Sequence, residues 1–123
     1  MGRYELLVRG AFSAAHQLRL EDGSLEPLHG HNWRVEVCLE GDRLAEPGYL
    51  ADFTVLQRQL NQITGALHDT FLNDHAAFQS DNPSTELVAR YIHDTFAPML
   101  PETVRICKVQ VWETSECAAA YLP

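Results

Sequence analysis

The stretch HGHNWRVEVCLE, residues 29–40, alternates apolar and polar side chains from Trp33 onward. Alternation over such a run predicts a β-strand with one buried face and one polar face. His29 and His31 are in phase with the apolar set, because residues i and i+2 point to the same side of a strand. Two imidazoles on a buried face are costly unless their nitrogens find partners. A bound metal ion would provide one.

A strand carrying a third histidine is predicted just upstream. Residues 4–16 (YELLVRGAFSAAH) begin with strong β-formers and end at His16, whereas residues 17–28 are polar, contain glycine and proline, and read as a loop. If the two strands pair antiparallel, His16 lies at the same end of the hairpin as His29 and His31. The sequence therefore predicts a three-histidine metal site, although an isolated HxH pair is often only two surface or core histidines.

Zinc is the metal that this donor set favours. Three protein ligands with a fourth position open are typical of catalytic zinc, which acts as a Lewis acid. The three cysteines, Cys38, Cys107 and Cys117, lie far from the histidines in sequence, so the predicted site is all-nitrogen. An odd cysteine count without a signal-peptide pattern predicts reduced thiols and a cytoplasmic protein.

The remaining chain predicts two helices followed by two strands. Apolar residues recur at helical spacing before residue 68 and again before Pro98, and alternation returns after residue 103. The order β-β-α-α-β-β predicts an α+β fold, a four-stranded antiparallel sheet with two helices on one face. The predicted bounds are strands at 4–16, 29–40, 103–113 and 117–122, a first helix from Asp52 or Thr54 to Leu67, a packed loop over 68–82, and a second helix capped by Asn82 with Pro83 as its first residue.

Glu113 stands out on the strand predicted over residues 103–113. Strict alternation puts Glu113 on the face of Val109 and Val111, with Ile106 on the other face. A carboxylate that continues an apolar strand face usually has a specific partner. Glu113 is therefore a candidate site residue.

The composition limits the possible functions. We expect 123 residues to form one domain, residues 1–123, around one core. The formal net charge of −8 argues against a nucleic-acid-binding surface, which needs a basic stripe. No apolar run is long enough to predict a membrane span. A small sheet with helices on only one face leaves its other face and its edges uncovered, which predicts an oligomer.

Six short motifs, spread in order over almost the whole chain, carry a family resemblance. They are FSAAHQL at 12–18, HGHNW at 29–33, DF at 52–53, LND at 72–74, NPSTE at 82–86 and VWET at 111–114. Together they resemble the 6-pyruvoyltetrahydropterin synthases, a family that includes the 6-carboxytetrahydropterin synthases of queuosine biosynthesis. The resemblance implies the tunnelling fold, or T-fold, in which such units join into a trimeric barrel and two trimers stack as a homohexamer.

The resemblance also implies a site and a chemistry. It implies Zn²⁺ on the three histidines and a pterin held between subunits, with Glu113 gripping the guanidine-like edge of the ring and Ser84 and Thr85 also in contact. The implied substrate is 7,8-dihydroneopterin triphosphate or a related pterin, whose side chain reacts by metal-assisted proton abstraction. A carboxylate suits the pterin edge because it accepts two parallel N–H donors.

Two catalytic positions depart from the family pattern. The usual base is a cysteine four residues before the first histidine of HGH, and here that residue is Leu25. The usual Asp-His pair appears in reversed order as His68-Asp69, a shift of about 100° around a helix. Glu26 is a candidate replacement base, because some branches carry a loop glutamate and cleave dihydroneopterin to 6-hydroxymethyl-dihydropterin. The candidate catalytic groups are thus Glu26, His68 and Asp69, although each could instead be an ordinary surface or helix-end residue.

Three functions remain open from the sequence. The first is a zinc-dependent pterin synthase or lyase with altered proton-transfer groups. The second is a pterin-binding homologue without the usual reaction. The third is a zinc-stabilised oligomeric scaffold, against which Glu113 argues, because a scaffold does not need a carboxylate on an apolar face.

Overall fold

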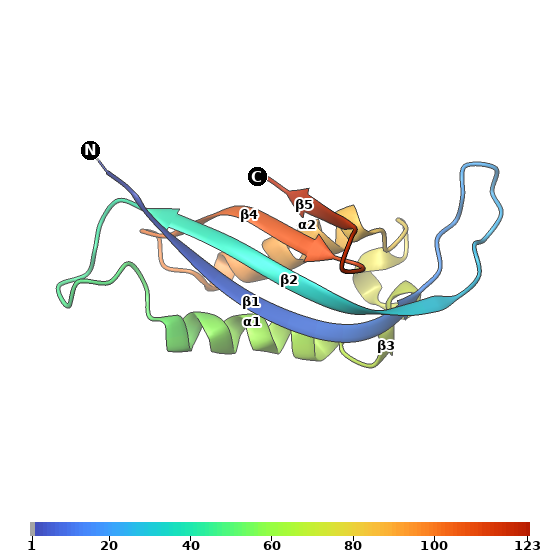
Figure 1. Ribbon diagram of the computed structural model, residues 1–123, viewed down its shortest axis with the longest axis horizontal. Helices are drawn as coiled ribbons and strands as arrows, with labels where there is room; N and C mark the ends of the chain where they lie inside the picture. The colour runs from blue at the N-terminus through green and yellow to red at the C-terminus, as the bar shows by residue number, and fades with distance from the viewer. Residues whose placement is uncertain (1) are drawn as a thin grey trace.

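A five-stranded sheet with two helices on one face forms the structure, a computed structural model that describes residues 2–123 (Figure 1). The α+β class predicted from the sequence is confirmed. The elements are β1 (Tyr4–His16), β2 (His29–Gly41), α1 (Phe53–Leu67), β3 (Thr70–Phe71), α2 (Thr85–Phe96), β4 (Arg105–Trp112) and β5 (Ala118–Tyr121), with short 3₁₀ turns at Leu72–Asp74, Ala76–Phe78 and Ala97–Met99. The order across the sheet is β3-β1-β2-β4-β5.

The two long strands pair antiparallel along their full length, as predicted. His16 lies opposite His29, and Ala14 lies opposite His31. This register brings the three histidines to the end of the hairpin where residues 17–28 loop away from the sheet (Figure 1). The hairpin register therefore fixes the location of the candidate site.

A fifth strand lies where the sequence predicted only a packed loop. β3 pairs in parallel with Ala14 and Ala15 at the outer edge of β1. Asp69 turns the chain from α1 into β3 with a φ of 58°, a left-handed conformation that aspartate tolerates better than most residues. At the other end of α1, Asp52 is the cap, accepting a bond from the Thr54 backbone N–H at 2.8 Å.

The start of α2 differs from the prediction for a physical reason. Ser84, not Asn82, is the N-cap, and its Oγ accepts from the Leu87 backbone N–H at 3.2 Å. The Asn82 side chain instead accepts from the Arg19 N–H at 2.9 Å and donates to the Arg19 carbonyl at 2.8 Å. The predicted cap at Asn82, with Pro83 inside the helix, was wrong because this amide clamps the 17–28 loop.

A bulge in β4 changes which residues share a face. Pairing with β2 skips one residue, so that Cys107 has no partner across the ladder. One extra residue reverses the alternation. Ile106 therefore joins Val109 on the helix-covered face, where both are buried, and the predicted assignment of Ile106 to the opposite face was wrong.

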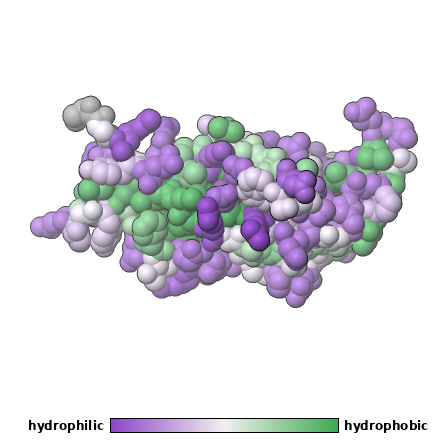
Figure 2. Space-filling model, viewed as in Figure 1, coloured by the Kyte–Doolittle hydropathy of each residue, from purple (hydrophilic) through white to green (hydrophobic). Residues whose placement is uncertain are grey.

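The core lies between the helices and the covered face of the sheet. Trp33 is fully buried there, stacks on Phe12, and donates its Nε1–H to the Ala14 carbonyl at 3.1 Å. The opposite face is polar in part, with Glu36 accepting from Arg9 at 3.2 Å. Figure 2 shows mixed polar and apolar surface, with an apolar area toward the N-terminal side of the sheet. Within residues 2–123, neither helix is long and apolar enough to cross a membrane.

Candidate metal centre

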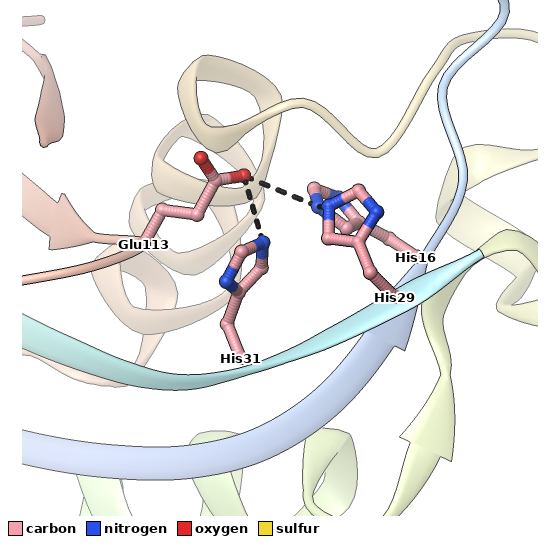
Figure 3. Close-up of side chains that lie close together, drawn as sticks. All are labelled: His16, His29, His31 and Glu113. Carbon is pink, nitrogen blue, oxygen red and sulfur yellow. Dashed lines mark hydrogen bonds and ion pairs between the residues drawn. The ribbon is translucent and has the colours of Figure 1, made fainter. Parts of the chain in front are cut away.

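Four side chains from three strand ends converge beside the covered face of the sheet. His16 ends β1, His29 and His31 begin β2, and Glu113 directly follows β4. One ligand atom from each lies within 4.8 Å of the other three (Figure 3). The structure thus brings together the predicted three histidines and adds Glu113 as a fourth possible ligand, which the sequence count of three ligands had missed.

Backbone carbonyls fix the protonation of two of the imidazoles. His16 Nδ1 is 2.8 Å from the Pro83 carbonyl, and His29 Nδ1 is 2.8 Å from the Pro27 carbonyl. A carbonyl can only accept, so each Nδ1 carries the proton and each Nε2 keeps a free lone pair. Such partners orient a histidine ligand and raise its basicity. Both Nε2 atoms are therefore prepared to bind a cation.

The arrangement of the Nε2 atoms itself fits a metal ion. His16 Nε2 and His29 Nε2 are 3.0 Å apart, and two lone pairs at that distance repel unless a cation lies between them. His31 Nε2 is buried and has no hydrogen-bond partner within residues 2–123. An orphaned buried nitrogen of this kind is costly unless it binds something. Burial lowers the pKa of His31, which favours the neutral form that a metal needs.

Glu26 lies at the margin of this cluster. Its Oε1 is 3.8 Å from His29 Nε2 and accepts a hydrogen bond from the Leu18 backbone N–H at 3.1 Å. Leu25 is 61% exposed, so the residue at the family's cysteine position does not line a buried site. Glu26 is thus a half-buried carboxylate that a backbone N–H holds at the edge of the cluster. Its catalytic role stays a prediction.

The segment before α2 touches the metal centre through its backbone. The Pro83 carbonyl that accepts from His16 immediately precedes Ser84 and Thr85, the two residues for which a pterin contact is predicted. Since Ser84 caps α2, its hydroxyl oxygen is already engaged with a backbone N–H. Nothing in the contacts tests pterin binding by either residue, but both lie next to the cluster along the chain.

Ser84→Ala is expected to lower the free energy of unfolding by about 1 kcal/mol, because the Leu87 N–H loses its acceptor at the first turn of α2. Urea denaturation of the metal-free protein measures this change. Ser84→Asp keeps an acceptor oxygen and should retain most of the stability. An alanine variant with an unchanged midpoint would contradict the capping role.

His68 and Asp69 do not join the cluster. The Ser13 backbone N–H donates to His68 Nδ1 at 3.0 Å, and His68 Nε2 is 3.4 Å from Asp69 Oδ2. Within residues 2–123, no hydrogen bond or ion pair links either residue to the three metal-site histidines or to Glu113. Asp69 lines a shallow hollow of about 470 Å³ together with Ser13, Asn32 and also His31 of the cluster.

Other residues that hold the site gave little or no signal in the sequence. Asn73 accepts from the Gln17 N–H at 2.9 Å and donates to the Gln17 carbonyl at 2.6 Å, so it fixes the chain just after His16. The LND motif at 72–74 was the only sign of its importance. The carbonyls of Pro27 and Pro83 cannot be recognised from side-chain identity at all, because any residue supplies one.

Comparisons with known proteins agree with the motifs. The family model described as 6-pyruvoyl tetrahydropterin synthase matches residues 5–123. The dihydroneopterin monophosphate aldolase of Pyrococcus furiosus is 32% identical over 111 residues, which are 90% of this chain and 90% of that one. The 6-carboxy-5,6,7,8-tetrahydropterin synthase of Bacillus subtilis is 35% identical over 119 residues, with 90% of this chain and 80% of that one covered.

Solved structures show the same fold. The 6-pyruvoyl tetrahydropterin synthase of Caenorhabditis elegans superposes with a TM-score of 0.84 at 23% identity, covering 100% of this chain and 97% of that one. The Plasmodium vivax 6-pyruvoyl tetrahydropterin synthase gives 0.81 at 22% identity, covering 98% of each chain. The resemblance inferred from the motifs is confirmed: the chain belongs to the 6-pyruvoyl tetrahydropterin synthase family.

Proposed function

We propose that the protein is a zinc-dependent enzyme that cleaves the side chain of a 7,8-dihydroneopterin to give 6-hydroxymethyl-dihydropterin, with Glu26 as the base. The observation that carries this proposal is the position of Glu26, whose Oε1 is 3.8 Å from His29 Nε2 in a loop that has no cysteine. The name of the Pyrococcus furiosus relative, an aldolase acting on dihydroneopterin monophosphate, supports the same reaction class.

The three histidines would hold the zinc through their Nε2 atoms. Bound zinc supplies Lewis acidity, which makes the side-chain hydroxyls of the substrate easier to deprotonate. The carbonyls of Pro27 and Pro83 hold two of the imidazoles in the required tautomer. The Leu18 N–H orients Glu26 toward the cluster. These residues prepare the site before substrate arrives.

Glu26 would first take the proton from the hydroxyl on the second side-chain carbon. The bond between the first and second side-chain carbons then breaks, and the second carbon leaves as an aldehyde. The electron pair passes into the carbon–nitrogen double bond of the dihydropterin ring. Glu26 returns the proton to the first carbon, which becomes the hydroxymethyl group. The step needs no oxidant and no further reactant.

The pterin ring would be held by Glu113, with Ser84 and Thr85 nearby. A carboxylate can accept two parallel N–H bonds from the guanidine-like edge of a pterin, which fixes the ring orientation. Glu113 is 27% exposed, so a ligand can reach it from solvent. The Pro83 carbonyl, which is 2.8 Å from His16 Nδ1, directly precedes Ser84 and Thr85 in the chain, and this adjacency supports the proposed contact. The ring would therefore lie with its side chain toward the histidines.

A second candidate is a 6-carboxytetrahydropterin synthase reaction on the triphosphate, which the 35% identity to the Bacillus subtilis enzyme favours. It would use the same zinc and pterin contacts. Leu25 argues against it, because leucine cannot act as the base that a cysteine provides at this position. In this reaction, His68 and Asp69 would have to act in the site of a neighbouring subunit. Within their own chain they contact Ser13 and each other.

We also propose the oligomeric state and the location. The helix-free face of the sheet and its edges suit assembly into a trimeric barrel and a homohexamer, and Leu7 on that face is 42% exposed. The cytoplasm is the expected compartment, because the chain carries unpaired cysteines in the described residues. No nucleic-acid or membrane partner is proposed.

The function is tested by incubating the zinc-loaded protein with 7,8-dihydroneopterin, its monophosphate and its triphosphate. We expect at least one of them to give 6-hydroxymethyl-dihydropterin and a two-carbon aldehyde in equal amounts. Chromatography measures both products. Protein treated with a chelator and then reloaded with zinc is the control. A tetrahydropterin product would favour the second candidate. If no substrate gives a product, the remaining hypothesis is a pterin-binding homologue without the reaction.

A further inference from the structure

We propose that the helix-free face of the sheet carries a second ligand site, which binds a small organic anion made of a flat heteroaromatic ring and a phosphate group. The site is a hollow of about 570 Å³ over β1, β2 and β4, and Arg9, Arg34 and Trp112 are among the residues that line it. None of the four residues of the metal centre lines this hollow. The proposal therefore does not depend on the proposed function.

Two rows of side chains across the sheet build the hollow. In the first row, Arg34 of β2 lies between Ala11 of β1 and Trp112 of β4. In the next row, Glu36 of β2 lies opposite Arg9 of β1. Residues two apart on a strand share a face, so both rows project from the helix-free side. The single methyl group of Ala11 leaves space beside Arg34, and the indole of Trp112 lies on its other side.

Glu36 holds two of the lining side chains in place. Its Oε2 accepts a hydrogen bond from Arg9 Nε at 3.2 Å, and its Oε1 accepts one from Trp112 Nε1 at 2.9 Å. The indole N–H thus has the partner that fixes the plane of the ring. Arg9 uses only its Nε–H in this contact, so the four N–H groups at the end of its guanidinium stay available to a ligand.

The hollow has a surplus of positive charge on an acidic chain. Arg9 and Arg34 line it with two positive charges, and Glu36 supplies one negative charge. Arg34 is exposed, and its guanidinium makes no hydrogen bond or ion pair within the part of the chain that the structure describes. The formal net charge of the chain is −8, so a pair of neighbouring arginines is a local exception. Guanidinium groups match phosphate with parallel N–H donors.

The size of the hollow favours an organic anion over a bare ion. Its volume of about 570 Å³ lies in the range of about 300–1,000 Å³ that is typical of small-molecule sites. Trp112 is half-buried and offers a flat π surface on which a heteroaromatic ring can stack. In the proposed trimeric barrel the helices would lie outside, so this face would line the central channel and stay open to a ligand.

AMP is the probe for this site, because it combines a heteroaromatic ring with a phosphate. Isothermal titration calorimetry measures its Kd for the whole wild-type protein, Arg34→Gln and the control Arg43→Gln, which removes an exposed arginine elsewhere. We expect Arg34→Gln to bind AMP at least about tenfold more weakly, because charge-assisted hydrogen bonds are lost, and Arg43→Gln to match wild type. Unchanged affinity in Arg34→Gln overturns the proposal, as does the absence of AMP binding to wild type at millimolar concentration.

Two fragments of AMP separate the ring from the phosphate. Adenosine keeps the ring without the charge, and inorganic phosphate keeps the charge without the ring. We expect each of them to bind wild type much more weakly than AMP does. If inorganic phosphate binds as tightly as AMP, the ring contact is wrong, and if adenosine does, the anion contact is wrong. Either result overturns the assigned class of ligand.

Tryptophan emission tests where AMP binds. The chain has two tryptophans, of which Trp33 is fully buried and Trp112 lines the hollow. We expect AMP to change the emission of wild type but not that of Trp112→Phe, which keeps a flat ring and should still bind AMP in the calorimeter. An emission change that persists in Trp112→Phe overturns the location. A loss of AMP binding after treatment with a chelator would assign AMP to the metal centre and overturn the location as well.

Discussion

Glu26→Gln is expected to lower kcat for dihydroneopterin cleavage by about 10²–10⁴, the usual contribution of a positioned base. Glutamine has nearly the same shape and can still accept from the Leu18 N–H, which the glutamate does at 3.1 Å. It cannot take a proton from the substrate. Zinc content and KM should change little, because the nearest Glu26 oxygen is 3.8 Å from His29 Nε2 and is not a ligand in this arrangement. Steady-state kinetics and metal analysis of the same preparation give these values.

Glu21→Gln is the matched control for this experiment. Glu21 is an exposed acid of the same 17–28 loop, so its replacement removes the same charge away from the cluster. We expect its kcat to equal that of wild type. A Glu26→Gln enzyme with full kcat would rule out Glu26 as the base and direct attention to His68 and Asp69.

His16→Ala and His29→Ala are both expected to reduce zinc binding to background, but only His16→Ala should strongly destabilise the metal-free protein. His16 is fully buried and bonds the Pro83 carbonyl, so alanine leaves a cavity and an unpaired acceptor. We expect a cost of about 2–4 kcal/mol in the free energy of unfolding. The His29 side chain is 37% exposed, and water can replace its bond to the Pro27 carbonyl.

Urea denaturation in excess chelator separates the loss of metal from the loss of packing. Both variants are compared with wild type under the same metal-free conditions, so that any stabilisation by bound zinc is absent from all three. A His16→Ala midpoint equal to that of metal-free wild type would show that His16 contributes to folding only through the metal. Zinc retained in either variant would contradict the assignment of that histidine as a ligand.

The hairpin and its histidines could be predicted because local pattern determines them. Alternation places His29 and His31 on the covered face, and antiparallel pairing brings His16 opposite His29. Both rules depend only on residues within the hairpin. The alternation within residues 103–113 likewise predicted that the Glu113 side chain points inward. The structure places Glu113 Oε1 3.1 Å from His16 Nε2.

The remaining features depend on partners that are distant in the chain. Ile106 changes face because β4 has one residue more than its partner strand at Cys107, and alternation within β4 gives no sign of that mismatch. Asn82 has a suitable side chain for a helix cap. Its amide oxygen instead accepts a hydrogen bond from the backbone N–H of Arg19, which is 63 residues away in the chain. His16 donates its Nδ1–H to the Pro83 carbonyl, and a backbone carbonyl has no signature in the sequence.

The division of the site between strands and a loop bears on how this protein could change over evolutionary time. The three imidazoles extend from paired strands whose register fixes their positions, whereas Glu26 lies in a loop whose tip has exposed residues on both sides of Gly23. Mutations in the loop can replace or move the base without altering the metal ligands. A duplicated copy could therefore acquire a new reaction on the same pterin by drift in one surface segment, while purifying selection preserves the strands.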